Sequence, residues 1–399
     1  MKKKIWLSEP GLICCAGKNR NELYNSCLTG FQGGMVTREL PSANGKFPVG
    51  QIPGELPKVN APPESLVKEP PVFATETRII RIIDTALEQM RPNIEKAIAK
   101  YGPEKIGVCL GSCDNGSEGS LPAHQALFAQ GAFPRNYSLR FQSAAFPAEF
   151  IALKFGLCGP VFTIATACAS GASAIIRGVE LIRSGLCDAV IAGGADIVSD
   201  TVFAGFHALE AISDSLTNPF SKNRKGINLG EGAAFFILEA EENSPVELSG
   251  AGESADAYHI TAPGTDGAGP AKAMKAALVD AELKADQIGY INLHGTGTDL
   301  NDKAEALAMK AVFDNAPPIS STKPITGHTL GAAGALEAAI CWMVLTEKRG
   351  LPVHCWDGVK DEEITVFPDK GDRQKTPSIC MSNSFAFGGC NVSLILGRR

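Results

Sequence analysis

The sequence predicts an α/β fold in which helices cover the faces of the sheets. Short apolar segments rich in β-branched residues, typical of buried strands, alternate with longer segments whose apolar residues recur at helical spacing. This alternation runs through the 399 residues and its order is repeated in the second part of the chain. We therefore expect two similar halves, residues 1–245 and 246–399, with covered sheets.

In the first half, strand and helix signals alternate. Strands are expected at 4–17, 105–111, 161–166, 188–194 and 230–239. Helices are expected at 19–30, 73–101, 147–156, 170–182 and 201–212. Residues 33–71 are dense in Pro and Gly with little periodicity, which predicts a loop or cap over the core. Residues 112–117, after a buried strand, are expected to form a turn-rich loop.

The second half repeats this order. Strands are expected at 246–252, 288–293, 318–322, 378–382 and 391–396, and helices at 270–281, 302–313 and 330–347. Pro270 would take the first helical position, where its missing N–H costs nothing. Segments 163–176 and 321–334 are both short strands that lead into helices rich in Gly and Ala. If the two helices pack along these small faces, Cys168 comes near Lys323 and His328.

Composition excludes several classes of protein. The net charge of −6 argues against a protein that wraps nucleic acid, since phosphate binding needs a basic surface. No apolar run reaches the length of a membrane span. The basic start is followed at once by Glu9 and Pro10, which indicates a first strand and not a signal peptide. The twelve cysteines are scattered without metal spacing, so we expect reduced thiols, no metal and a cytoplasmic protein.

Cys168 is the candidate nucleophile. It stands where an apolar strand turns into a helix, and free N–H groups and the helix dipole favour a thiolate there. The alternative is that Cys168 is simply a small buried apolar residue.

Two histidines, His294 and His328, occupy Gly-rich turns directly after apolar strands, where α/β sheets bind their ligands. Together with Cys168 they form a plausible nucleophile with two proton donors. The set suits acyl-thioester chemistry, although a Cys–His hydrolase would use the same atoms. A hydrogen-bonded structural role for either histidine is the alternative.

Charged and flexible groups near these turns suggest a supporting network. Lys323, Glu337 and Glu305 could place a paired charge behind the histidines, unless Lys323 is a solvated surface residue.

Gly388 and Gly389 permit backbone angles that would aim an N–H into the site as half of an oxyanion hole, with the Cys168 N–H as the other half. The alternative for that segment is a tight turn with its Phe side chains in the core. Segment 218–232 lacks the ending and the preceding strand of a phosphate-binding loop.

Several motifs, taken together, resemble the β-ketoacyl-acyl-carrier-protein synthases, condensing enzymes of fatty-acid and polyketide synthesis. The motifs run in family order over nearly the whole chain: Thr166-Ala-Cys-Ala-Ser170, Pro219-Phe-Ser-Lys-Asn-Arg-Lys-Gly226 with Gly230-Glu-Gly232, Asp256-Ala-Tyr-His-Ile-Thr-Ala-Pro263, His294-Gly-Thr-Gly-Thr298 with Asp302-Lys-Ala-Glu305, Ser321-Thr-Lys-Pro-Ile-Thr-Gly-His328 and Asn383-Ser-Phe-Ala-Phe-Gly-Gly389. The resemblance implies a thiolase-like fold, a duplicated five-layered αβαβα arrangement.

The same resemblance implies a decarboxylative condensation of an acyl thioester, held on Cys168, with malonyl-acyl-carrier protein. It implies a catalytic set of Cys168, His294, His328, Lys323 and Phe387, in which Lys323 acts as electrostatic support and the Phe387 ring gates the acyl pocket. It further implies a set of substrate contacts: Thr261, Thr296, Thr298, Phe206, Asp114 and Phe385. Two carboxylates, Glu305 and Glu337, would support the site. No cofactor is bound permanently, because the phosphopantetheine arm comes on the acyl carrier protein, and a homodimer is expected, with a heterodimer as the alternative.

The chain also departs from the family pattern. Ser221, Asn223 and Lys225 stand where acidic residues are usual, and Ala386 replaces a common Gly and could stiffen the gate. Asp114 falls near a usually apolar position of the acyl pocket, so we expect a polar or unsaturated acyl chain, as in aryl-polyene or other specialised pathways.

Two alternatives to a condensing enzyme follow from the same motifs. A thiolase-type enzyme would need a second catalytic Cys, for which Cys390, where the family commonly has Thr, is the candidate. A non-catalytic partner subunit of another ketosynthase is disfavoured by the intact Cys168 and the two histidines. Carrier proteins are acidic, so a local basic patch is expected, with Arg78 and Arg81 as candidates.

Overall fold

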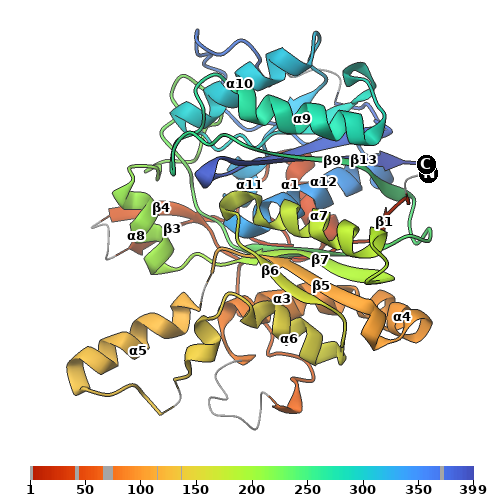
Figure 1. The fold of residues 1–399 in the computed structure, drawn as a ribbon. Helices are drawn as coiled ribbons and strands as arrows, with labels where there is room; N and C mark the ends of the chain where they lie inside the picture. Colours follow the sequence, from red (N-terminus) through yellow and green to blue (C-terminus); the bar gives the residue numbers. More distant parts are fainter. Residues whose placement is uncertain (1–2, 41–44, 66–74, 115, 136, 369–372) are drawn as a thin grey trace.

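The computed structural model describes residues 3–40, 45–65, 75–114, 116–135, 137–368 and 373–399, and its elements stack in five layers (Figure 1). One outer layer holds α9 (Ala268–Ala281) and α10 (Asp299–Val312), and the other holds α3 (Arg78–Gln89), α4 (Arg91–Tyr101) and α6 (Phe146–Phe155). Between the two layers of strands lie α7 (Ser170–Arg183) and α12 (Ala333–Glu347). The five-layered αβαβα arrangement predicted for the chain is therefore confirmed.

The strand order shows the duplication directly. One half-sheet runs in the order β6 (Val161–Ile164), β5 (Ile106–Gly111), β7 (Ala189–Asp196), β8 (Gly232–Glu239), and the other in the order β11 (Ile319–Ser320), β10 (Tyr290–Asn292), β12 (Ile379–Phe385), β13 (Cys390–Arg398). In each, the first three strands are parallel and the fourth is antiparallel. The chain thus builds the same crossover pattern twice.

The first strand of the chain joins the half-sheets. In β1 (Trp6–Leu7), Trp6 pairs with Glu239 of β8 on one side and with Glu247 of β9 (Val246–Ala255) on the other. β9 in turn pairs with β13, while β2 (Gly11–Cys14) pairs with β8. The predicted division at residue 245 falls between β8 and β9 and stays a prediction.

The two central helices approach each other along small residues. A Cβ atom on Gly171 of α7 would lie 2.7 Å from the carbonyl oxygen of Gly331, and one on Gly334 of α12 would lie 2.8 Å from the Cβ of Ala172. Only residues without a larger side chain permit this contact. Close packing of the predicted small faces is confirmed, and it brings the N-terminal ends of both helices together.

Helix α12 also belongs to the longest apolar segment of the molecule. Among the described residues, Leu330–Glu347 is the single helical stretch long and apolar enough to cross a membrane, and 89% of it is buried inside the structure. The packing between two sheets accounts for that apolar composition, because all faces of the helix need apolar partners.

The N-terminal part differs from the prediction in three places. Within the loop or cap predicted at 33–71, β3 (Met35–Leu40) and β4 (Gly45–Gly50) form an antiparallel hairpin, so part of this segment is strand and not loop. The predicted strand at 4–17 is divided into β1 and β2. The helix predicted at 73–101 begins at Arg78 and is divided at Met90, where Pro92 in the first turn of α4 lacks an N–H and starts a new helix.

Smaller differences concern helix ends. α1 (Arg20–Thr29) begins after Asn19, whose side chain accepts a hydrogen bond from the Glu22 N–H, as capping requires. α8 (Asp200–Ala208) is shorter than predicted. Helix α9 begins two residues earlier than expected, so Pro270 occupies its third position and not its first. Helix α5 (Ser117–Gln130) was not predicted, since Gly119 and Pro122 weaken its helical pattern.

Candidate functional site

Cys168 lies at the junction that the sequence indicated. It is the middle residue of a 3₁₀ turn (Ala167–Ala169) between β6 and α7, and it is buried. Ala167 has a φ of +48°, a left-handed conformation that an L side chain rarely adopts. The equivalent turn before α12 has Leu330 at +49°, so both halves build the same strained turn, and only the first carries a thiol.

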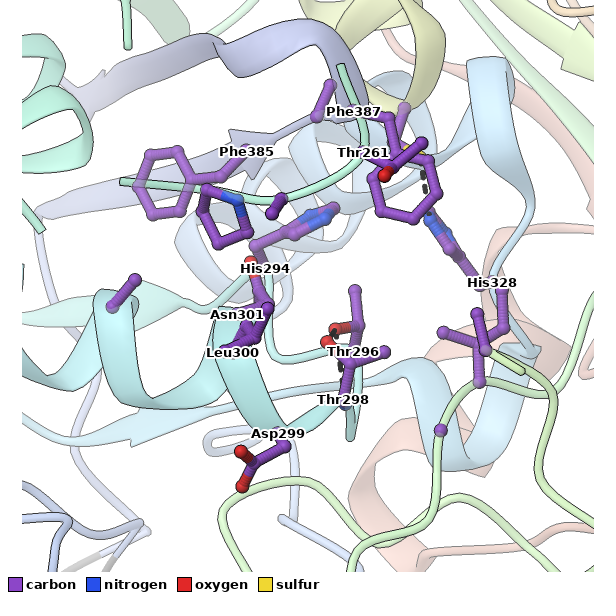
Figure 2. A pocket seen from close by; sticks show the side chains of 18 of the residues that line it. Thr261, His294, Thr296, Thr298, Asp299, Leu300, Asn301, His328, Phe385 and Phe387 are labelled. Carbon is purple, nitrogen blue, oxygen red and sulfur yellow. Dashed lines mark hydrogen bonds between the residues drawn. The ribbon is translucent and has the colours of Figure 1, made fainter. Parts of the chain in front are cut away.

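His328 is in direct contact with the thiol. Its Nε2 lies 2.9 Å from the Cys168 Sγ (Figure 2). The backbone of His328 is held on both sides, because its N–H donates to the Asn228 carbonyl at 2.7 Å and its carbonyl accepts from the Gly230 N–H at 2.9 Å. The ring is thus oriented by a backbone ladder from a distant segment of the chain.

His294 completes a triad with these two residues. Its ring centroid lies 5.5 Å from that of His328, with the ring planes nearly perpendicular. The Glu305 carboxylate accepts from the N–H groups of His294 at 2.8 Å and Gly295 at 2.7 Å. Glu305 therefore fixes the backbone of the turn after β10. Among the described contacts, it forms no hydrogen bond to the imidazole ring of His294.

Lys323 is a buried cation behind His294, not a surface residue. Its Nζ lies 2.5 Å from the Glu337 Oε1 and donates to the His294 carbonyl oxygen at 2.5 Å. The same Nζ is 3.5 Å from the His294 Nδ1. Because an unpaired buried ammonium would be costly, the ion pair with Glu337 is what allows a positive charge at this depth.

The electrostatics keep the reacting groups neutral at rest. Burial, followed by the charge of Lys323, holds the pKa values of His294 and His328 well below the usual range. Burial also raises the pKa of the Cys168 thiol to about 12, although Lys323 acts in the opposite direction. The resting site is therefore a thiol beside two neutral imidazoles, each able to donate or accept one hydrogen bond.

Burial acts on the supporting carboxylates as well. It raises the pKa of Glu305 to about 7 and that of Glu337 to about 7, against the lowering effects of the N–H donors and of Lys323 respectively. Both carboxyl groups therefore hold a proton more readily than an exposed carboxyl group does.

A cavity of about 430 Å³ opens onto Cys168 and both histidines. Most of the predicted substrate contacts line it: Phe206, Thr261, Thr296, Thr298, Phe385 and Phe387. Figure 2 shows Thr296 and Thr298 below the two histidines, and their hydroxyl groups lie 3.0 Å apart. Lys323, Glu305 and Glu337 do not line the cavity and act through the residues that do.

The segment after β12 carries the predicted gate. The Phe387 ring lies at the cavity with its centroid 5.6 Å from that of Phe206. Gly388 has a φ of +83° and donates its N–H to the Ile260 carbonyl at 2.8 Å, which ties the gate to the neighbouring loop. The N–H groups of Cys168 and Phe387 make no hydrogen bond to the residues that the structure describes. They are therefore available to an oxyanion.

Three predicted residues have other surroundings. Asp114 does not line the cavity: its carboxylate accepts from the Gly116 N–H at 3.0 Å and the Ser117 hydroxyl at 2.6 Å, at the start of α5. These bonds compensate its burial without a ligand, so Asp114 gives no reason to expect a polar acyl chain. Both candidates for the basic patch are paired with carboxylates, since Arg78 binds Glu231 with two nitrogens and Arg81 pairs with Glu76, and the patch itself stays a prediction.

Cys390, the candidate second thiol of a thiolase, is half-buried at the start of β13 and is not among the cavity residues. Within the described ranges, no three His, Cys, Asp or Glu side chains gather as a metal site would need. The site can therefore accept an acyl group on one thiol, that of Cys168, and has room for one further carbonyl between the imidazoles of His294 and His328.

Several residues were not predicted from the sequence to belong to the site. Arg224 and Lys225 line the cavity, and Asp302 accepts from the Phe220 N–H at 2.7 Å and the Gly297 N–H at 3.2 Å. Asp256 accepts from the Asn391 side chain at 2.7 Å, which connects the Thr261 loop to the gate. All of them except Asn391 lie within the quoted motifs, which were the available signal.

Comparison with known proteins agrees with this geometry. The family models described as beta-ketoacyl synthase, N-terminal domain and C-terminal domain match residues 70–244 and 246–354. Nodulation protein E of Rhizobium meliloti (strain 1021) is 40% identical over 411 residues, with 99% of each chain covered. The 3-oxoacyl-[acyl-carrier-protein] synthase 2 of Vibrio cholerae serotype O1 is 38% identical over 316 residues, which cover 74% of this chain and 76% of the relative.

Solved structures show the same likeness. A chain in the structure of the ketosynthase ApeO in complex with its chain length factor ApeC, from Xenorhabdus doucetiae, superposes with a TM-score of 0.91 at 37% identity, covering 100% of this chain and 98% of that one. The ishigamide ketosynthase/chain length factor has a TM-score of 0.85 at 27% identity, with 100% of both chains covered.

Proposed function

The chain belongs to the β-ketoacyl synthase family, and from that membership we propose how its own residues divide the reaction. It is a condensing enzyme that joins an acyl thioester to malonyl-acyl-carrier protein and yields β-ketoacyl-acyl-carrier protein. The observation that supports the division of roles is the 2.9 Å contact between the Cys168 Sγ and the His328 Nε2 at one cavity with His294.

In the first half-reaction Cys168 accepts the acyl group. His328 Nε2 takes the thiol proton, the sulfur attacks the acyl thioester carbonyl, and the proton passes to the departing thiolate of the carrier arm. The N–H groups of Cys168 and Phe387 stabilise the oxyanion of the tetrahedral intermediate. Because burial raises the pKa of Cys168 to about 12, the base at 2.9 Å is needed to generate the thiolate.

In the second half-reaction the malonyl thioester carbonyl lies between the two imidazoles. His294 and His328 each donate one hydrogen bond to its oxygen, which stabilises the enolate left when the C–C bond to CO₂ breaks. The enolate carbon then attacks the acyl-Cys168 carbonyl, the C–S bond breaks, and the Cys168 thiolate takes a proton from water. Neutral histidines suit this role, because the low pKa values keep them uncharged donors.

The remaining cavity residues would position the substrates. Thr261, Thr296 and Thr298 would contact the phosphopantetheine arm of the carrier protein, and the Phe387 and Phe206 rings would close over the acyl chain. Lys323, through its bond to the His294 carbonyl and its pair with Glu337, is a positioning residue.

The experiment that tests these roles follows the covalent intermediate. Purified enzyme is incubated with acyl-carrier-protein thioesters and malonyl-carrier protein, and intact-mass spectrometry records acylation of the protein. We expect an acyl adduct that is absent from the Cys168→Ala variant, with a product two carbons longer. An adduct that persists in the variant would place the nucleophile elsewhere. No adduct with any donor would favour a non-catalytic partner subunit.

We also propose that the chain assembles with a second chain of the same fold through β6. This strand pairs only with β5 in the described structure, and Phe162 on it is 49% exposed. An apolar edge strand of this kind is a template for pairing with another chain. The structures titled as ketosynthase with chain length factor support a heterodimer as the alternative to a homodimer.

Native mass spectrometry of the purified chain distinguishes these assemblies. A homodimer predicts twice the chain mass, and Phe162→Glu should convert it to monomer. A monomer that becomes a dimer only when a related subunit is co-expressed indicates the heterodimer. A monomer under both conditions, or a dimer unaffected by Phe162→Glu, would refute pairing through β6.

A further inference from the structure

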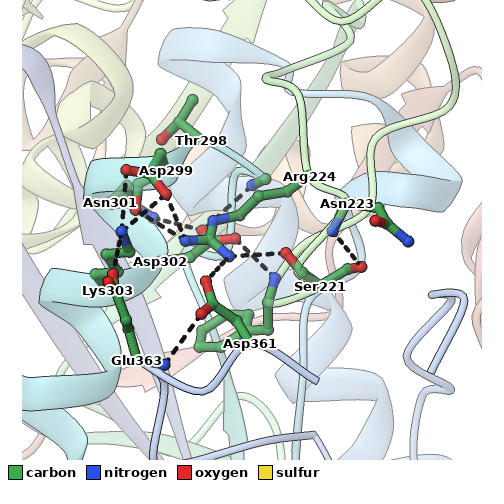
Figure 3. Close-up of polar contacts among 12 residues, drawn as sticks. Ser221, Asn223, Arg224, Thr298, Asp299, Asn301, Asp302, Lys303, Asp361 and Glu363 are labelled. Carbon is green, nitrogen blue, oxygen red and sulfur yellow. Dashed lines mark hydrogen bonds and ion pairs between the residues drawn. The ribbon is translucent and has the colours of Figure 1, made fainter. Parts of the chain in front are cut away.

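Two cationic side chains, Arg224 and Lys225, line the cavity, and they differ in how firmly their charges are paired. The Arg224 side chain is 2% exposed, with its Nη1 2.7 Å from Asp361 and its Nη2 2.7 Å from Asp299 (Figure 3). Its Nη1 also donates to the Ser221 carbonyl at 2.7 Å. The charge of Arg224 is therefore already compensated by protein carboxylates.

Lys225, the next residue, is free to bind a ligand. Its side chain is 60% exposed and lines the cavity, and it forms an ion pair at 3.3 Å with Asp214, which is itself 65% exposed. A pair between two solvated side chains at this distance is weak, because solvent screens it and both side chains must be ordered. The ammonium can therefore exchange Asp214 for an anion at the cavity.

The backbone that carries Lys225 is held on both sides. Before it, Arg224 is clamped between the start of α10 and Asp361, as Figure 3 shows. After it, Gly226 donates its N–H to the Gly297 carbonyl at 2.9 Å and accepts from the Thr217 hydroxyl at 2.8 Å. These contacts fix the Cα of Lys225 beside the Thr296–Thr298 turn, so the cation is attached to a rigid part of the cavity wall.

The start of α10 adds to the positive potential. Thr298 is the N-cap residue of this 14-residue helix, yet its side chain makes no capping bond and instead contacts the Thr296 hydroxyl. Asp299, Leu300 and Asn301 of the first turn line the cavity together with Lys225. In addition, the Arg224 Nε is buried without a hydrogen-bond partner among the described atoms. The first turn also carries two carboxylates. Asp299 is compensated by Arg224 and by Lys303 at 3.1 Å, and Asp302 accepts from the N–H groups of Phe220 and Gly297.

We propose that Lys225 binds the phosphodiester of the phosphopantetheine arm, next to the start of α10. This inference rests on the proposed function, in which the arm brings a thioester to Cys168. If the pantetheine portion lies along Thr296 and Thr298, then the phosphodiester, at the opposite end from the sulfur, reaches the outer part of the cavity where Lys225 is exposed. A lysine ammonium and the positive end of a helix are both favourable partners for a phosphate.

Glu210, one of three acidic residues that line the cavity together with Asp256 and Asp299, opposes this binding. Glu210 lines the same cavity, is exposed, and forms no ion pair that the described contacts include. Its carboxylate would repel a phosphodiester. Removing that charge in Glu210→Gln should therefore act in the opposite direction to removing Lys225.

Binding of the free arm tests the proposal without any need for turnover. Calorimetry measures the affinity of the unmodified enzyme for 4′-phosphopantetheine and for pantetheine, which lacks the phosphate. We expect phosphopantetheine to bind more tightly, and Lys225→Ala to weaken its binding about five- to tenfold, the size of one partly solvated charge-assisted hydrogen bond. Pantetheine binding should not change. Glu210→Gln should tighten phosphopantetheine binding, and Lys222→Ala, an exposed lysine of the same loop outside the cavity, should have no effect.

Turnover then distinguishes the arm from the carrier protein. The KM values for malonyl-carrier protein and malonyl-phosphopantetheine should both rise in Lys225→Ala, while that for malonyl-pantetheine and all kcat values stay constant. A rise for the carrier protein alone would overturn the proposal and show that Lys225 contacts the carrier surface. Equal phosphopantetheine affinity in the unmodified enzyme and Lys225→Ala would also overturn it, even in an enzyme that condenses normally. If the unmodified enzyme forms no condensation product, the proposed function itself is refuted.

Discussion

Replacing Lys323 by Met should move the acid limb of the pH–rate profile toward neutral pH. The Lys323 Nζ lies 3.5 Å from the His294 Nδ1, and two unit charges at that separation repel by about 5 kcal/mol at an effective dielectric constant of roughly 20. Glu337, 2.5 Å from the same nitrogen, cancels part of this repulsion. A net effect of about 1.5–3 kcal/mol on the protonation of His294 corresponds to about one to two pH units.

The sign follows from the direction of the pKa shifts. Burial and the charge of Lys323 hold the pKa values of His294 and His328 well below the usual range, so both stay neutral donors into the acid region. Without the ammonium, the pKa values of both rings rise and a fraction becomes charged at a higher pH. The neutral form is the one that the decarboxylation step uses, so activity is lost earlier on acidification.

The assay is decarboxylation of malonyl-carrier protein across pH 5 to 8, with unmodified enzyme and Lys323→Met compared at each pH. Thermal unfolding of both proteins controls for loss of structure. Met retains most of the volume of the Lys stem, and Glu337 can then take up a proton because its pKa is already raised to about 7 by burial. A variant with lower kcat but an unchanged acid limb would refute the electrostatic role and leave Lys323 as a purely structural residue.

Further outcomes follow from single contacts in the site. His294→Ala removes one of the two donors to the malonyl thioester oxygen and should lower kcat for decarboxylation about a hundredfold or more. Acylation of Cys168, which uses His328, should persist in the intact-mass assay. Equal loss of both steps would contradict the division of roles. Ala386→Gly should loosen the gate, because Gly lacks the Cβ that restricts the backbone next to Phe387, and should raise the rate of acylation by bulky primers relative to short ones; an unchanged ratio would show that Ala386 does not stiffen it. Asp357→Ala should lower the free energy of unfolding by about 1 kcal/mol, because the carboxylate accepts from the Ser221 hydroxyl at 2.7 Å and the Asn223 amide at 2.8 Å. An unaltered unfolding temperature would show that these bonds do not contribute to stability.

The local order of the chain could be predicted from sequence. Strand and helix periods depend on near neighbours, so the alternation, its repetition and the small faces of α7 and α12 were visible without a structure. The same holds for Cys168 and His294, because each closely follows a strand, and the end of a strand in an α/β sheet points to the ligand side. For His328 the predicted strand was wrong, since the short helix α11 (Lys323–Thr326) lies between β11 and this residue. The helix ends and the hairpin of β3 and β4 were less accessible, since weak local preferences there are overridden by packing.

Long-range pairing was decided only by the tertiary structure. Whether Lys323 is solvated or buried depends on where α12 places Glu337, and Arg78 was expected at the surface until its two bonds to Glu231, 153 residues away, were seen. Ser221 and Asn223 lack the acidic character usual at their positions, yet Asp357 supplies a carboxylate to both from another loop. Sequence therefore determined which chemical groups the chain places at the ends of its strands. Only the fold decided which of their charges are compensated and which, like that of Lys225, remain available, because compensation depends on residues that are distant in sequence and close in space.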